Sequence, residues 1–190
     1  MALSNAALLI MDFQQDVIAM TAAAGSAAAV ERARAAIDGA RAHGLPVIFV
    51  RVAFRDGYPE TAARNKRMSV LRDKGLLRES SPGARIAPEL DPRPSDPVVV
   101  KRRVSALTHT DLPTLLRAND VHTLVMAGLT TSGVVLSTVR QAADADYRLI
   151  VLEDACADPD ADVHRVLMTR ILPTQADVIT VQAFLHELAA

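Results

Sequence analysis

Short apolar runs alternate with longer stretches of helical periodicity along this sequence. The runs at 6–11 (AALLIM) and 47–52 (VIFVRV) bracket the alanine-rich stretch 27–42, whose charged residues give it one polar side. Gly44 and Pro46 lie between that stretch and the second run, as expected where a helix ends and a strand begins. The order predicts a strand, a helix and a second strand, which together form a βαβ unit.

The same alternation continues over the second half of the chain. It predicts further strands at residues 98–100, 123–127, 148–154 and 177–180, with Gly128 ending the second of these. It predicts further helices at residues 112–118, 132–144, 162–171 and 183–189. Several runs are too hydrophobic to be half exposed, which is typical of a parallel sheet covered on both faces. The predicted fold is therefore three-layer α/β, with helices on both sides of a six-stranded, mainly parallel sheet.

Composition narrows the class of protein. A chain of 190 residues suffices for one well-cored domain, predicted to span 1–190, and is short for two. The 21 basic and 22 acidic side chains give no charge excess for nucleic acid, and no apolar run approaches the roughly 18 residues that span a bilayer. The single cysteine, Cys156, excludes an intramolecular disulfide and a multi-thiolate metal site. We expect a cytoplasmic protein that binds neither membranes nor nucleic acid.

Residues 55–97 differ from the rest of the chain. Turn-forming sequences and the proline-rich stretch 88–97 interrupt a single charged helical segment, predicted at 62–74. We interpret this part as an excursion within the domain. Long connections of this kind border a ligand pocket at the carboxyl ends of the strands in some α/β folds, and are plain surface loops in others.

Polar residues close several of the predicted strands. In an open parallel sheet the ligand crevice lies beyond the carboxyl ends of the strands, where this chain has Asp12, Arg51, Lys101 and Gly128. If the strands before Asp12 and Lys101 are neighbours, their carboxylate and ammonium meet in a sheltered crevice. There the lysine keeps the aspartate ionised or stabilises negative charge on a substrate. A structural ion pair and two unrelated strand ends are the alternatives.

The segment after Gly128 places small and hydroxylic residues at a predicted turn from strand to helix. The start of a helix presents unpaired backbone N–H groups, which suit a carboxylate or an oxyanion. In the alternative interpretation Thr131 or Ser132 only caps the helix, and the valines after them pack against the core.

Three segments of the chain resemble the isochorismatase-like hydrolases, also called the cysteine hydrolase superfamily. They are LLIMDFQQD at 8–16, VVVKRRVSAL at 98–107, and VMAGLTTSGVVLSTVRQAADADYRLIVLEDACAD at 125–158. The resemblance implies a six-stranded, Rossmann-like parallel sheet flanked by helices. It also implies a small-molecule substrate and a homodimer or homotetramer.

The resemblance also implies roles for individual residues. Asp12 and Lys101 match the acidic and basic members of the family's Asp, Lys and Cys triad, and Gln14 matches the Asp-x-Gln pattern after the first strand. Thr130 follows the family's non-proline cis peptide, whose amide N–H helps to form an oxyanion site. The triad cysteine position falls on Val134, which is expected to line the same pocket.

A valine cannot attack a carbonyl carbon, so the thioester chemistry of the family's nicotinamidases is not expected. The isochorismatase branch, some of whose members also lack the cysteine, implies hydrolysis of a vinyl ether, for which Asp12 would supply a proton. We therefore expect a hydrolase of a small, anionic metabolite that uses Asp12 and Lys101 in acid–base chemistry. The alternatives are an inactive binding or structural homologue and a slow amidohydrolase in which Asp12 activates water.

Other side chains could replace the missing cysteine as nucleophile. The candidates are the thiol of Cys156 and the hydroxyls of Ser132, Ser137 and Thr138. No cofactor is expected, and no metal, because the 5 histidines have no ligand spacing. Four further residues are candidates for contact with the substrate, namely Arg51, Arg55, Tyr58 and His109. The alternative is that they are ordinary surface or packed residues.

Overall fold

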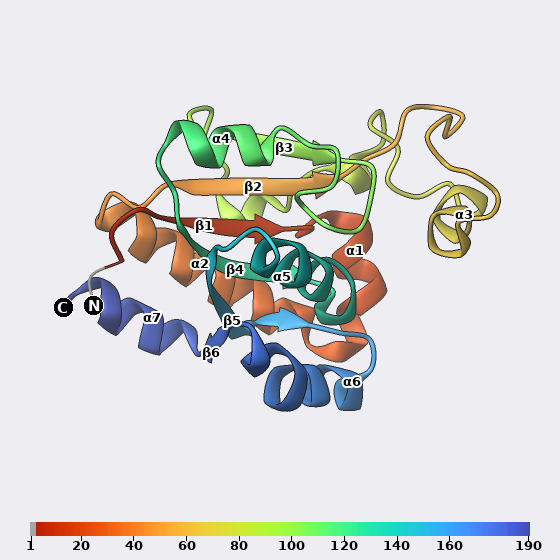
Figure 1. Cartoon of the computed structure of the whole chain (residues 1–190). Coiled ribbons are helices and arrows are strands. Elements are labelled where there is room, and N and C mark those ends of the chain that lie inside the picture. Colours follow the sequence, from red (N-terminus) through yellow and green to blue (C-terminus); the bar gives the residue numbers. More distant parts are fainter. Residues whose placement is uncertain (1–2) are drawn as a thin grey trace.

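The computed structural model describes residues 3–190, apart from the side chain of residue 24. Its centre is a parallel sheet of six strands in the order β3-β2-β1-β4-β5-β6 (Figure 1). The strands are β1 (Ala6–Met11), β2 (Val47–Val52), β3 (Val98–Lys101), β4 (Thr123–Leu129), β5 (Arg148–Ala157) and β6 (Asp177–Ile179). The three-layer α/β fold predicted from the sequence is confirmed.

Helices cover both faces of the sheet (Figure 1). The helices of the described residues are α1 (Gln15–Thr21), α2 (Ser26–Ala42), α3 (Lys66–Asp73), α4 (Leu112–Ala118), α5 (Leu136–Ala143), α6 (Ala161–Val166) and α7 (Val181–Leu188). Of these, α3 lies in the excursion beyond the ends of the strands and covers neither face (Figure 1). Single turns of π-helix precede α5, at Thr131–Val135, and follow α6, at Leu167–Ile171. No helix in the described residues is long and apolar enough to cross a bilayer.

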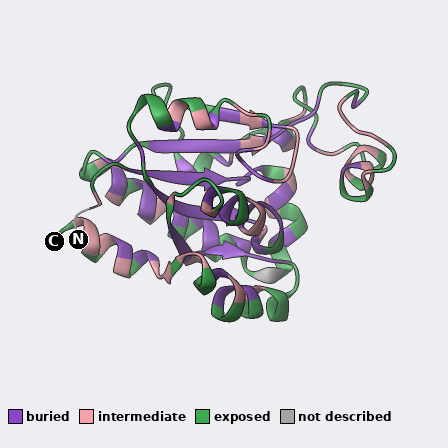
Figure 2. Cartoon of the chain, viewed as in Figure 1, coloured by how far each residue is buried: buried purple, intermediate pink, exposed green. Residues whose placement is uncertain are grey.

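Two hydrophobic cores lie on opposite faces of the sheet, and successive residues of β1 alternate between them. Leu8 and Ile10 belong to the core under α2 and α7, whereas Leu9 and Met11 belong to the core under α4 and α5. This period of two follows from the pleat of a strand. The central strands are therefore buried along their whole length (Figure 2), which explains why they are apolar at consecutive positions.

Strand β4 corrects one prediction. Gly128 does not end the strand, because it still pairs with Cys156 of β5 after a register shift that follows Met126. A methyl group at Gly128 would lie 3.1 Å from a carbon of Val135 and 3.2 Å from Met11, so a glycine lets the strand and the turn approach each other. The strand therefore carries two more residues toward the ligand edge of the sheet than predicted.

Several further boundaries differ from the predicted ones. The helix predicted at 162–171 is α-helical only over Ala161–Val166 and continues as a π-helical turn. The helix predicted at 132–144 begins with the π-helical turn, and the helix predicted at 62–74 forms only over Lys66–Asp73, where Asn65 caps it. Strand β5 continues past 154 to Ala157, and Asp154 instead accepts a hydrogen bond from Val181 at the start of α7. Helix α1 has no counterpart among the predicted elements.

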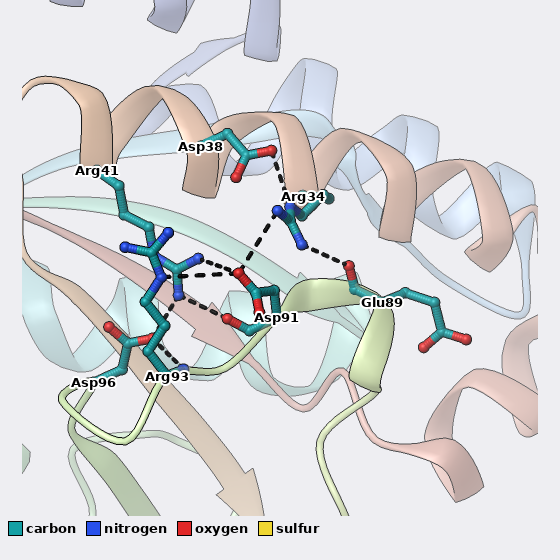
Figure 3. Close-up of polar contacts among 7 residues, drawn as sticks. All are labelled: Arg34, Asp38, Arg41, Glu89, Asp91, Arg93 and Asp96. Carbon is teal, nitrogen blue, oxygen red and sulfur yellow. Dashed lines mark hydrogen bonds and ion pairs between the residues drawn. The ribbon is translucent and has the colours of Figure 1, made fainter.

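The excursion runs past the carboxyl ends of the strands (Figure 1). Its returning part is held on α2 by ion pairs, in which Arg41 binds Asp96 at 2.6 Å and Asp91 at 3.3 Å (Figure 3). The Arg41 and Asp96 side chains are only 11% and 12% exposed, so this contact is better shielded than an ordinary surface pair. Other members of the network are Arg34, Asp38, Glu89 and Arg93.

Candidate active site

Asp12 and Lys101 meet at the carboxyl edge of the sheet. The Nζ atom of Lys101 lies 2.8 Å from Oδ2 of Asp12, and both side chains are almost completely buried. The condition stated from the sequence is not met, because β2 lies between β1 and β3. The two side chains instead meet across the end of β2, and together they bridge the two strand spacings, about 9.6 Å, that separate β1 from β3.

The chain segment after β3 fixes the ammonium of Lys101. Its Nζ atom donates a second hydrogen bond, of 3.1 Å, to the carbonyl of Arg103. Arg102 holds this segment in place by donating to the Ala53 carbonyl and by binding Glu60 at 3.2 Å. The Arg103 carbonyl, on a segment that Arg102 anchors, therefore helps to orient the lysine toward Asp12.

Burial changes the protonation chemistry of the pair. It raises the pKa of Asp12 above the usual value, against the positive charges of Lys101 and Arg67, which lower that pKa. Burial also lowers the pKa of Lys101, Arg67 lowers it further, and Asp12 opposes both effects. The second carboxylate oxygen of Asp12, Oδ1, is buried and has no hydrogen-bond partner among the described residues. This carboxyl group is able to hold or exchange a proton at Oδ1 while Oδ2 stays bound to Lys101.

A small cavity of about 50 Å³ adjoins the pair. Asp12, Lys101, Thr130 and Val134 contribute to its wall, together with apolar side chains of α1 and α3. The Oγ1 atom of Thr130 is a second buried polar atom without a partner in the described part of the chain. Buried polar atoms need a hydrogen-bond partner, and these two atoms, which belong to residues of the cavity wall, have none within the described protein.

The turn between β4 and α5 shapes the other side of the cavity. The Leu129–Thr130 peptide is cis, as the resemblance implied. The carboxylate of Asp158 accepts a 2.7 Å hydrogen bond from the Ser132 amide, which fixes the start of the π-helical turn. Val134, in that turn, is buried against the cavity. The wall next to Asp12 and Lys101 is therefore apolar at Val134 and offers no nucleophile there.

Arg67 on α3 lies at the mouth of the cavity. A methyl group at Gly133 would lie 2.5 Å from Thr130 Oγ1 and 3.1 Å from Nη2 of Arg67, so glycine leaves room for both. Arg67 makes no ion pair with a carboxylate within residues 3–190. Its charge therefore faces the cavity without a protein counter-ion, which suits an anionic ligand.

Gln14 lies directly behind the site. Its side-chain amide donates 2.8 Å hydrogen bonds to the carbonyls of Val52 and Ala84, and its oxygen accepts from the Val52 amide. With donor and acceptor both engaged, Gln14 holds the end of β2 and the excursion together. It does not contribute to the cavity wall.

The four possible substrate contacts lie outside the cavity. Arg51 donates to the Ala84 carbonyl, and Arg55 is an exposed residue paired with Glu60. Tyr58 is buried against Phe54 and donates its hydroxyl to Leu76. His109 is exposed on a loop with positive φ. The structure therefore does not bring these four residues to Asp12.

None of the substitute nucleophiles reaches the cavity either. Cys156 lies on β5 and is buried in the core under α4 and α5, and this burial raises the pKa of its thiol to about 12. Thr138 accepts a hydrogen bond from Ala106 in the interior, and Ser132 is exposed. Within residues 3–190, no three histidine, cysteine or acidic side chains gather as a metal site would require.

Two residues of the site were missed from the sequence. Asp158 follows the true end of β5 by the same logic that selected Asp12, but the strand was predicted to stop at 154. Arg67 has no comparable signal, because the helix that carries it lies in an irregular excursion and its position depends on tertiary contacts.

Comparison with known proteins identifies the family and the fold of the chain. The sequence model of the isochorismatase domain matches residues 6–183. The isochorismatase family protein YecD of Escherichia coli O157:H7 is 30% identical, over 96% of this chain and 95% of its own. The maleamate amidohydrolase of Pseudomonas putida is 29% identical, over 96% of this chain and 86% of its own. A crystal structure of a cysteine hydrolase from Pseudomonas syringae pv. phaseolicola superposes with a TM-score of 0.87 at 28% identity, covering 97% of this chain and 92% of that one.

Proposed function

The chain belongs to the isochorismatase family of hydrolases, and we propose that it hydrolyses a small anionic metabolite with Asp12 and Lys101 and without a cysteine nucleophile. The observation that carries this proposal is the buried Asp12–Lys101 pair, which lines a cavity bordered by Val134 and whose Oδ1 atom has no protein partner in the described residues. Two charges are costly to bury, and an ion pair that leaves one oxygen unsatisfied is better explained by chemistry than by stability.

We assign Asp12 as the general acid. Its raised pKa keeps a proton available at a higher pH than an ordinary aspartate would. In cleavage of a vinyl ether, this proton passes to the terminal vinyl carbon, and water adds to the oxocarbenium carbon that results. The adduct then loses the alcohol and leaves a carbonyl product, which balances the reaction without a covalent enzyme intermediate.

We assign supporting roles to three neighbours. Lys101 orients Asp12 and stabilises negative charge, and Arg67 pairs with an anionic group of the substrate. The Thr130 side of the cavity, with the turn that holds Val134, provides the oxyanion pocket. At the family's nucleophile position, Val134 restricts this pocket and leaves attack to water.

A second candidate is hydrolysis of an amide by water that Asp12 activates. A specific observation favours it, because the maleamate amidohydrolase named above matches along nearly the whole chain. In this case the ionised form of Asp12 is the active one, and ammonia is released.

The two candidates are separated by a panel of small carboxylates that carry either a vinyl ether or a primary amide. Wild type and Asp12→Asn are incubated with each compound, and carbonyl products and ammonia are measured. We expect carbonyl release by wild type, with kcat lowered about 10²- to 10⁴-fold in Asp12→Asn, as is typical for loss of a general acid. Release of ammonia alone would favour the second candidate, and equal turnover by wild type and Asp12→Asn would contradict both.

A further inference from the structure

An open groove lies beside the small cavity. It measures about 490 Å³, and its apolar wall is formed by Met20 of α1, by Val70 and Leu71 of α3, and by Pro159. We call this the side groove. Met20 and Val70 are 45% and 47% exposed, although most large apolar side chains of the described residues are buried. Ligand sites are lined mainly by apolar side chains with a few polar groups, which is the composition of this groove.

The side groove and the small cavity are continuous. Met20, Leu71, Arg67 and Thr130 contribute to the walls of both. Helical spacing explains the continuity, because Val17 in the cavity and Met20 in the groove are one turn apart on α1. On α3, Arg67, Val70 and Leu71 share a face for the same reason.

The size of the cavity requires such an extension. About 50 Å³ accommodates a group the size of one or two water molecules, so a reacting group fits there and the rest of a metabolite does not. Atoms beyond the reacting group have room in the side groove, which shares the Thr130 and Arg67 part of its wall with the cavity. The surface that receives them there is apolar, with the cations Lys66 and Arg67 at its border.

We propose that the side groove binds a hydrocarbon substituent of the substrate, which is therefore an amphipathic anion and not a small, fully polar one. The reacting group enters the cavity at Asp12, the negative charge faces Arg67, and the hydrocarbon lies against Met20, Val70 and Pro159. This inference rests on the proposed function for the identity of the cavity, but its test measures binding and does not require turnover.

The test uses straight-chain carboxylates from butanoate to decanoate, below the concentrations at which they form micelles. Isothermal calorimetry with wild type should show that Kd falls about two- to fourfold for each added methylene, the change expected when such a group leaves water. In Val70→Gln this dependence on chain length should flatten, and the affinity for butanoate should stay within twofold. Val166→Gln is the matched control, because Val166 is 41% exposed and lies outside the groove.

Three results would overturn the inference. One is the absence of binding, or an affinity that does not grow with chain length. Another is equal flattening in Val70→Gln and Val166→Gln, which would indicate adsorption elsewhere. The third is a fall in molecular mass of Val70→Gln in sedimentation, which would assign this face to self-association. Failure of the proposed function would appear separately, as Asp12-independent turnover in the panel of vinyl ethers and amides.

Discussion

The site depends on a few atoms whose positions are tightly specified. Asp12 has a positive φ of 61°, a conformation that aspartate tolerates better than most residues, and its amide donates a 2.8 Å hydrogen bond to the Val50 carbonyl. The chain therefore leaves β1 with a fixed direction just where the carboxyl group must meet Lys101. A buried charge pair held in this way loses little entropy when a substrate arrives.

A cysteine placed at 134 should be reactive. In Val134→Cys the new thiol would lie beside the ammonium of Lys101, which favours the thiolate. We expect iodoacetamide at pH 7 to modify residue 134 within minutes, as measured by mass spectrometry of peptides. Wild type is the control, since the pKa of about 12 keeps Cys156 protonated and unreactive. Modification no faster than that of Cys156 would contradict the placement of Val134 in the active cavity.

Removal of the charge of Arg67 should shift the pH profile upward. Arg67 lowers the pKa of Asp12 and that of Lys101, so Arg67→Gln raises both values. Activity that needs protonated Asp12 and the Lys101 ammonium is lost as pH rises through these values, and the alkaline limb of kcat should therefore move to higher pH. KM for an anionic substrate should rise as well. Arg64→Gln, on the same excursion and outside the cavity, should leave the profile unchanged, and a downward shift in Arg67→Gln would refute the assignment.

At the scale of secondary structure, the site is assembled where three strands end and one turn begins. Asp12 directly follows β1, β3 ends at Lys101, and β4 leads into the turn that carries Val134. Asp158, which follows β5, ties that turn to the sheet through the Ser132 amide. The two residues that we propose as catalytic therefore lie at the ends of strands, and the excursion adds Arg67 to the cavity wall.

Loss of the Asp158 carboxylate should disturb this turn. In Asp158→Ala the Ser132 amide loses a largely buried acceptor, which we expect to cost about 1–3 kcal/mol of unfolding free energy. The turn would also move, so kcat should fall more than tenfold. Urea unfolding and kinetics measure the two effects. Asp158→Asn, which keeps a carbonyl oxygen in place, should recover most of both, and equal losses in the two variants would contradict this role.

The sequence predicted the elements of the sheet much better than their ends. Apolar runs identify β1, β2 and β4 because these strands are buried on both faces, a property of the local sequence. The extension of β4 past Gly128 depends on the close approach of this glycine to Met11 and Val135. Met11 is distant in sequence, and Val135 belongs to the element after β4, so the residues of the strand itself do not reveal this contact. Asp12 and Lys101 could be predicted as site residues because they close strands of a parallel sheet. The position of Arg67 results from the packing of α3 near the cavity, and the local sequence does not indicate it.

At the scale of the whole molecule, one sheet links two cores. Alternate residues of β1 and β4 enter opposite cores, so both cores pack on the same strands. We therefore propose that residues 1–190 form a single domain. The ion pairs of Arg41 with Asp91 and Asp96 extend this unit to the returning part of the excursion (Figure 3).

A single domain predicts one cooperative unfolding transition. Differential scanning calorimetry of the whole chain should give one peak, with the calorimetric enthalpy close to the van't Hoff enthalpy. Asp96→Ala, which removes the better shielded partner of Arg41, should lower the midpoint without splitting the peak. Two resolved peaks in wild type would contradict the single domain.

Hydrolysis without a thiol is tested most directly by the kcat of Cys156→Ala, a chain that contains no thiol because Cys156 is the only cysteine of the sequence. Measured on whichever carboxylate of the panel wild type turns over, kcat of this variant should stay within about twofold of wild type. In the same assay Asp12→Asn should lose about 10²- to 10⁴-fold. Loss of activity in a Cys156→Ala protein that remains folded, with retention in Asp12→Asn, would show that the thiol and not the buried carboxyl group performs the reaction.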